Sequence, residues 1–174
     1  KNILYYISNK YLNQEKNMKI SQKLIDAINE QINKELYSSY LYLSMAAYFD
    51  NKNLKGFANW MFLQSKEEYE HAMKFFHYLS ERGAKVELKT IDGPKTEWKS
   101  PLNVFEEVYS HEQKVSEMII NLLALAKKEE DYATENFLQW FIKEQVEEEA
   151  NASFIVERLK LIGDNIGALF IIDK

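Results

Sequence analysis

A helical stripe through residues 57–79 restricts the fold of this chain more than any other sequence feature. Its members are spaced by three and four residues, which is typical of a helix with one face in the core of a bundle. They are Phe57, Met61, Gln64, Glu68, His71, Phe75 and Tyr78. Glu68 and His71 stand three residues apart and therefore project from the same face. A carboxylate in a dry core must protonate, pair or bind a metal, so this pair is a candidate metal-ligating motif.

Three other stretches carry the same periodicity, and polar groups interrupt each one near its middle. Their stripes are Ile28, Ile32, Glu35, Ser39, Tyr42, Ala46 and Phe49; Phe105, Val108, Glu112, Val115, Ile119, Leu122 and Ala126; and Leu138, Phe141, Gln145, Glu148, Ala152, Ile155 and Leu159. With only five Gly and two Pro in 174 residues, the chain has little to interrupt long helices. We expect four helices, at about 21–50, 54–82, 101–129 and 131–162.

The segment of about 83–100 between the second and third helices is long and holds Gly93-Pro94. Extended at about 3.3 Å per residue, it can run the full length of a 28-residue helix, about 42 Å. We therefore expect it to cross from one end of a bundle to the other. The tail 164–174 is short and apolar, and we expect it to bury in the domain or in a subunit interface.

Composition excludes several classes of protein. The chain has no cysteine, so it has neither a disulfide framework nor a thiolate metal site, and a reducing compartment is expected. The net charge of −5 argues against a nucleic-acid partner. No apolar run is long enough to span a membrane, and no secretory signal is recognised. A cytoplasmic protein with no membrane partner is the expectation.

Residues 1–17 differ in composition from the rest and are rich in Lys, Asn, Tyr and Ile. Met18 precedes a clean helix start, so we expect an N-terminal extension at 1–17 ahead of one domain at 18–174. The alternative is a functional arm, in which Ile3, Ile7 and Tyr11 form a short apolar helical face.

The interrupting residues repeat with a regular spacing. Glu35 and Glu68 are 33 residues apart, as are Glu112 and Gln145, and His71 and Glu148 each follow three residues later. In a bundle these groups would meet at one level. A single buried Glu is explained equally well by a protonated acid with a hydrogen bond. Four carboxylates and a histidine together would repel unless cations neutralise them, and such a set fits two divalent ions, iron best.

At these residues the sequence strongly resembles the non-haem bacterial ferritins, over about 18–174. The matching runs are 33–42 (Asn-Lys-Glu-Leu-Tyr-Ser-Ser-Tyr-Leu-Tyr), 67–71 (Glu-Glu-Tyr-Glu-His), 109–113 and 137–149. The resemblance implies an all-α, ferritin-like four-helix bundle. It has one long crossover between the second and third helices and a short fifth C-terminal helix.

The resemblance also implies a di-iron ferroxidase centre. Glu35, Glu68 and His71 would hold one iron, and Glu68 would bridge to a second held by Glu112 and Glu148. Gln145 would lie beside the pair as a hydrogen-bonding group or weak ligand. A possible third iron site on the cavity side would comprise Glu67, Glu144, Glu147 and Glu148. Tyr42 matches a tyrosine next to the centre that donates an electron or a hydrogen bond, and Trp140 is expected to be packing.

Two related families fit less well. A bacterioferritin would carry a second Glu-x-x-His where this chain has Gln145 and Glu148, and an axial Met where it has Tyr69, so no haem is expected. A rubrerythrin would need cysteines. The Gln145 and Glu148 pair predicts a more labile second iron.

The function implied is iron storage with ferroxidase activity, in which O₂ or H₂O₂ oxidises Fe(II) and ferric mineral is deposited inside a homo-oligomeric shell of 24 subunits. One alternative is a shell component without oxidase activity. Another is a di-iron oxidase of an organic substrate, with a pocket lined by Tyr42, Phe75, Trp140 and Phe141.

Overall fold

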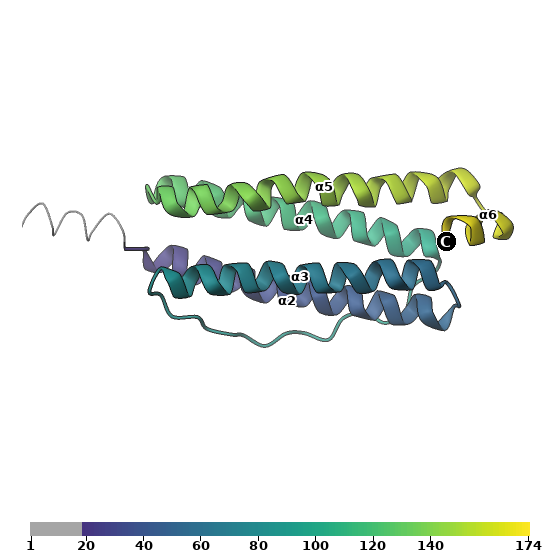
Figure 1. Ribbon diagram of the computed structural model, residues 1–174, viewed down its shortest axis with the longest axis horizontal. Coiled ribbons are helices and arrows are strands. Elements are labelled where there is room, and N and C mark those ends of the chain that lie inside the picture. The colour runs from purple at the N-terminus through teal and green to yellow at the C-terminus, as the bar shows by residue number, and fades with distance from the viewer. Residues whose placement is uncertain (1–18) are drawn as a thin grey trace, which may run out of the picture.

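Five helices account for most of the computed structural model, which describes residues 19–174 (Figure 1). They are α2 (Gln22–Asn51), α3 (Lys55–Glu81), α4 (Pro101–Lys128), α5 (Tyr132–Ile162) and α6 (Ile166–Ile172). The first four match the expected spans, and the expected extension at 1–17 lies outside the described residues. The ferritin-like bundle, its crossover and its short fifth helix are confirmed.

Polar side chains and glycines fix where the helices begin and end. The hydroxyl of Ser21 accepts a hydrogen bond from the N–H of Leu24, and the Asp131 carboxylate accepts one from Thr134. Each satisfies a backbone donor that the first turn of a helix leaves free. Gly163 ends α5 with a φ of 53°, a left-handed conformation that glycine adopts without strain.

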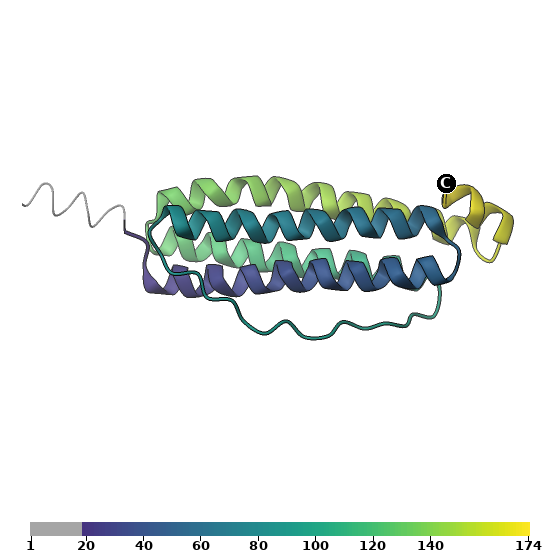
Figure 2. The ribbon, with the colours of Figure 1, turned by 60° about the horizontal axis from the view of Figure 1, so that its bottom comes forward.

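The bundle consists of two helical hairpins, α2 with α3 and α4 with α5, which lie side by side (Figure 2). The 83–100 segment runs along the outside of α2 from one end of the bundle to the other, as expected (Figure 1). Side chains of α2 hold it in place. Asn29 donates to the carbonyl of Lys85 at 3.2 Å, and Ser44 donates to that of Lys95 at 2.7 Å.

Two apolar clusters fill the ends of the bundle. The α6-end cluster is built on the later part of α2 and includes Met45, Phe49, Phe57, Phe105 and Leu159. The far-end cluster includes Leu24, Ile28, Phe75, Ile119 and Leu138. The middle of every long helix belongs to neither cluster, so a layer of the bundle between them is left to other side chains.

The predicted stripes are correct except at two positions. Ser38 and Val156 are buried, where the stripes named Ser39 and Ile155, which are half-buried. At both positions the neighbouring residue faces the core, because a stripe assigned by steps of three and four follows the 3.6-residue helical period only on average. Ser39 lies against α3 instead and donates a hydrogen bond to the carbonyl of Ser65 at 2.6 Å.

Helix α6 folds back on the end of the bundle. Leu169 and Ile172 pack against the α6-end cluster, and the Asp173 carboxylate accepts a hydrogen bond from the N–H of Phe57 at 2.8 Å. No residue of α6 is buried, and Ile166 and Ile171 are 68% and 72% exposed. The apolar tail is thus only partly covered by its own domain. Within residues 19–174, no helix is both long and apolar enough to cross a bilayer.

A partly buried ion pair joins the two hairpins at the far end. The Arg82 guanidinium contacts the Asp131 carboxylate with its two terminal nitrogens at 3.0 and 2.8 Å, and both side chains are about one-tenth exposed. We expect Arg82→Met to lower the free energy of unfolding by about 2–3 kcal/mol, because a partly buried carboxylate loses its charged partner. The shift is measured as the urea midpoint of the assembled protein.

Lys55→Met is the matched control, because Lys55 and Asp50 form a similarly close pair at 2.6 Å that is exposed to solvent. Exposed pairs contribute little to stability, so its midpoint should barely change. Equal shifts in the two variants would contradict a stabilising role for the partly buried pair.

Candidate metal centre

The layer between the two apolar clusters holds the polar residues that interrupt the four stripes. Each is 7% exposed or less: Glu35, Gln64, Glu68, His71, Glu112, Gln145 and Glu148. They come from α2, α3, α4 and α5, at the level where each helix leaves one cluster and enters the other. Six of them were expected to be buried together mid-bundle, in agreement with the structure, and Gln64 is an addition to that set.

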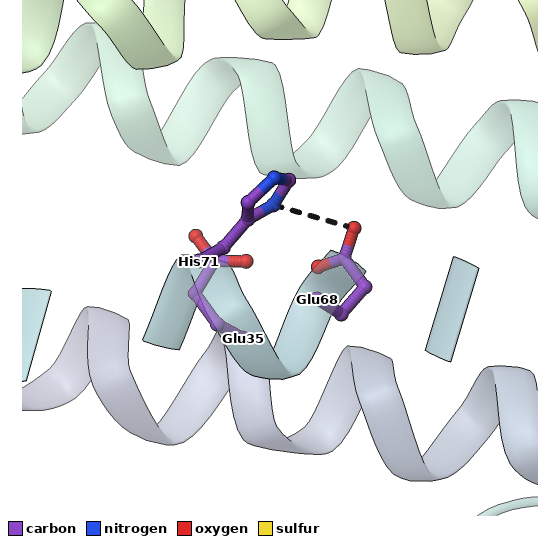
Figure 3. Close-up of side chains that lie close together, drawn as sticks. All are labelled: Glu35, Glu68 and His71. Carbon is purple, nitrogen blue, oxygen red and sulfur yellow. Dashed lines mark ion pairs between the residues drawn. The ribbon is translucent and has the colours of Figure 1, made fainter. Parts of the chain in front are cut away.

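Three of these side chains form the inner cluster, which we define as Glu35, Glu68 and His71. One ligand atom of each lies within 4.8 Å of the others, as expected for groups that share one ion. Figure 3 shows the two carboxylates and the imidazole gathered from α2 and α3. The Nδ1 atom of His71 lies 3.7 Å from Oε1 of Glu68. Two oxygens and a nitrogen so placed are a suitable donor set for a divalent transition metal.

Two carboxylate oxygens of the inner cluster have no hydrogen-bond partner among residues 19–174. They are Oε2 of Glu35 and Oε2 of Glu68, and both are fully buried. The other oxygen of Glu35 accepts a hydrogen bond from Nε2 of Gln31 at 2.9 Å. A buried polar atom without a partner carries a desolvation penalty of about 1–3 kcal/mol, more if charged. A cation between the two oxygens would remove that penalty, so the residues fit a metal.

Burial perturbs the acidity of the inner cluster. Burial, opposed by hydrogen bonds from Gln31 and Glu68 and reinforced by the charge of Glu112, raises the pKa of Glu35 to about 7. Burial and the charge of Glu35 raise the pKa of Glu68 well above its usual range. Burial, followed by the charge of Lys74, lowers the pKa of His71 to about 4. The imidazole is therefore neutral at pH 7 and has a lone pair available for a metal.

Glu112 lies next to the inner cluster and is held by two other polar side chains. The Tyr42 hydroxyl donates to its Oε1, and Nε2 of Gln145 donates to its Oε2 at 3.1 Å. Burial and the charge of Glu112 raise the pKa of Tyr42 well above 10, so the phenol keeps its proton. Gln145 makes a hydrogen bond here through its amide nitrogen, in agreement with the hydrogen-bonding role among the two expected for it.

Glu148 marks the outer edge of the layer, beside Glu67, Glu144 and Glu147. Glu67 and Glu147 are exposed and Glu144 is half-buried, so the expected third-site residues lie outside the inner cluster. Burial, and then the charges of Glu112, Glu67, Glu144 and Glu147, raise the pKa of Glu148 to about 8. The charges of these four neighbouring carboxyl groups therefore all act on Glu148.

The aromatic side chains near the centre pack against one another and against His71, with Phe75 and Phe141 in the core and Trp140 at the surface. Phe75 and Phe141 stack with ring centroids 4.1 Å apart, and both are almost fully buried. The Trp140 ring meets the His71 ring edge-on at 5.4 Å and carries the Lys74 ammonium 4.3 Å from its centroid. These contacts agree with the expectation that Trp140 is packing. The stacked rings of Phe75 and Phe141 are buried and present no open face to a substrate.

Sequence reasoning missed several polar residues that act on the acids. Gln31 and Gln64 are buried and donate hydrogen bonds to carboxylates of the layer. His111 precedes Glu112 and contacts the Ser38 hydroxyl through Nε2 at 2.7 Å. A signal was present for Gln64, which is a polar member of the stripe of 57–79. Gln31 and Ser38 lie beside the predicted stripe of their helix, and nothing in the spacing marks them.

Comparisons with known proteins give matches over the whole four-helix bundle. The ferritin-like domain family matches residues 25–162. The bacterial non-haem ferritin of Bacteroides fragilis is 47% identical over 155 residues, which cover 89% of this chain and 96% of the relative. That of Staphylococcus haemolyticus is 41% identical over 155 residues, covering 89% and 93%.

Solved structures agree with these sequence relatives. An open pore ferritin from the hyperthermophilic archaeon Archaeoglobus fulgidus has a TM-score of 0.89 at 54% identity, over 90% of this chain and 95% of the other. A closed form of the same ferritin, engineered by site-directed mutagenesis, has a TM-score of 0.88 at 55% identity, over 89% and 94%.

The raised pKa values of Glu35 and Glu148, about 7 and about 8, predict that protons compete with cations. At about pH 6 both carboxyls hold their protons and are poor ligands, and above about pH 8 both are ionised. We expect the affinity for Zn²⁺ to rise between these values by about tenfold for each proton displaced per pH unit. Calorimetry in buffers of different ionisation enthalpy measures both the affinity and the protons released.

The raised pKa values of Glu35 and Glu148 also determine how the stability of the metal-free protein changes with pH. A carboxyl whose pKa is raised from 4.5 by folding makes the metal-free fold progressively less stable as the pH rises from about 4.5 to that raised pKa, so the urea midpoint in chelator should fall between about pH 4.5 and 8. Added Zn²⁺ should restore more stability at the higher pH. A Zn²⁺ affinity independent of pH would contradict this account.

Proposed function

The chain belongs to the ferritin family and is related to the non-haem bacterial ferritins, and on that basis we propose that it is an iron-storage protein with ferroxidase activity. The family and the fold support iron storage. The observation that carries the ferroxidase assignment is the pair of buried, unpartnered oxygens on Glu35 and Glu68 beside His71. Two buried carboxylate oxygens that lack a hydrogen-bond partner among the described residues require a cation or a proton.

In the proposed centre, Fe(II) is the substrate. Glu35, Glu68 and His71 hold the first iron, and Glu68 extends to a second that Glu112 and Glu148 also hold. Support for this arrangement comes from the electrostatics, since the charges of Glu112 and Glu148 both raise the pKa of Glu68. Acids that repel one another in this way are those that gain most from sharing two divalent ions.

The protein's own groups have three tasks in the reaction. The carboxyls give up their protons as Fe(II) binds, and the ionised acids then favour Fe(III), the harder and more highly charged ion. Tyr42 and Gln145 keep Glu112 aimed at the centre through their hydrogen bonds. Two Fe(II) supply two electrons, which convert O₂ and two protons into H₂O₂, or H₂O₂ and two protons into two waters.

After oxidation, iron leaves across the outer acids. Glu67, Glu144 and Glu147, together with Glu148, offer successive carboxylates from the buried layer to the surface, and they constitute the proposed third site. Hydrolysis of Fe(III) beyond them would form the ferric mineral. The exposed positions of Glu67 and Glu147 support this order, because a solvated carboxylate holds a cation less tightly than a buried one.

We assign the mineral cavity to a homo-oligomeric shell of 24 subunits. The supporting observation is apolar surface that one subunit leaves uncovered. On α2 and α3 it comprises Tyr40, Leu43, Phe62, Leu63 and Tyr69, each 43–52% exposed, and on α6 it comprises Ile166, Phe170 and Ile171. Large apolar side chains left exposed on a single subunit are what an interface between subunits would cover.

A shell subunit without oxidase activity is the second candidate, because apolar docking surfaces alone would serve it equally well. That reading requires no ligands in the bundle, yet each ligand position carries a ligating residue, and the acids are buried together. An oxidase of organic substrates is disfavoured by the stacked pair Phe75 and Phe141, which fills the space beside the inner cluster.

The ferroxidase assignment predicts the behaviour of two variants. Glu68→Gln and His71→Ala remove a ligand atom each, and we expect the initial rate of Fe(II) oxidation in air to fall by about 10–100-fold. Stopped-flow absorbance of Fe(III) measures the rate. His77→Ala, which changes an exposed histidine on the same helix, is the control and should match the unaltered chain. Unchanged oxidation in both ligand variants would overturn the assignment.

A shell of 24 subunits should have a defined mass and should retain iron. Native mass spectrometry should give a species of 24 chains, each of 20.6 kDa. Loaded with an excess of Fe(II) in air, this species should carry iron through gel filtration. Replacing exposed Leu63 with Glu places a charge on the docking surface and should give smaller species that still oxidise Fe(II). A chain that elutes as a monomer under all conditions would contradict the shell.

A further inference from the structure

Gln64 is a buried amide beside the metal centre and holds no iron in the proposed reaction. It lies on α3, one turn before Glu67 and Glu68, and is 5% exposed. Its amide nitrogen donates to Oε2 of Glu67 at 2.7 Å, and it also faces both oxygens of Glu148 on α5 at 3.4 and 3.3 Å. One side chain thus connects a buried carboxylate of the centre with an exposed carboxylate outside it.

The two carboxylates depend on this amide. Among the residues that the structure describes, Gln64 is the sole hydrogen-bond donor to Glu148 and likewise to Glu67. An amide nitrogen has two hydrogens, so both are engaged, one by each carboxylate. A carboxylate has about four lone-pair positions, and each acid therefore keeps coordinating capacity for an ion while the amide fixes its orientation.

We propose that Gln64 is a positioning residue for the transfer of iron between the buried centre and the outer acids. By donating to Glu148 and Glu67 together, it holds the inner and outer carboxylates toward each other, so that an ion leaving one meets the next. This inference rests on the proposed ferroxidase function. It adds that Gln64 controls how fast iron leaves the buried centre after each turnover.

The contact distances indicate how this control works. The bond to Glu67 is short, and the contacts with Glu148 are long and shared between its two oxygens. The amide is therefore anchored on the exposed acid and holds the buried acid more loosely. Glu148 can move to an incoming ion while Glu67 stays in place. The amide nitrogen also places partial positive charge between the two carboxylates to which it donates.

Gln64→Met tests the proposal, because it keeps the length of the side chain and removes both donors. Stopped-flow oxidation is followed for a first addition of two Fe(II) per chain and for later additions at fixed intervals. We expect the later additions to slow by about tenfold more than the first. Calorimetry with Zn²⁺ should show the weakest class of sites losing affinity by a similar factor.

Gln64→Glu serves as a second variant if the methionine does not fold. It has the same shape and can donate one hydrogen bond at most, so it should produce the same selective slowing. Gln139→Met is the matched control, since Gln139 is an exposed glutamine on α5 that bonds only the backbone carbonyl of Glu135. It should leave both phases unchanged.

The outcomes separate this inference from the proposed function. Equal slowing of first and later additions would show a merely structural role and overturn the inference, as would no change in either phase. In both cases the loss of initial oxidation in Glu68→Gln would leave the ferroxidase assignment standing. If Glu68→Gln also oxidised Fe(II) at the normal rate, the proposed function itself would fail.

Discussion

The burial of several acids in one dry layer is the constraint on which the rest of the structure depends. Glu35, Glu68 and Glu112 are 1% exposed, and Glu148 is 7% exposed. Buried in one layer of the bundle, such groups cannot all be ionised in a low dielectric without a compensating charge. The protein without metal responds through raised pKa values, and the proposed protein with iron responds through coordination. Protons and cations are thus alternative occupants of the same layer.

The apolar parts of the bundle make this layer possible. A cluster at each end supplies the hydrophobic burial that offsets the cost of the polar layer between them. The far end is closed by the Arg82–Asp131 pair, and the α6 end by the contact of Asp173 with the first turn of α3. With both ends fixed, the middle of each helix keeps a defined position, and so do the side chains that converge there.

Much of this was predictable from sequence because helical spacing determines which side chains share a face. The 33-residue repeat that relates Glu35–Glu68 to Glu112–Gln145 gave both the hairpins and the acids that are buried. Spacing does not describe how side chains from different helices pair. The hydrogen bonds that Gln31 and Gln64 donate to carboxylates were overlooked for that reason. Which acid receives a hydrogen bond is a property of tertiary packing, and it requires coordinates.

Hydrogen bonds are distributed unevenly between the inner cluster and the outer carboxylates of the layer. The unpartnered oxygens lie on Glu35 and Glu68, in the inner cluster, whereas Glu148 and Glu67 share the amide of Gln64. An ion gains most where it removes the largest unsatisfied charge, so capture is favoured at the inner cluster. It gains less at carboxylates that already have donors or face water. In the proposed function, a centre built this way would bind Fe(II) at depth and release Fe(III) outward, which is the order that an iron store requires.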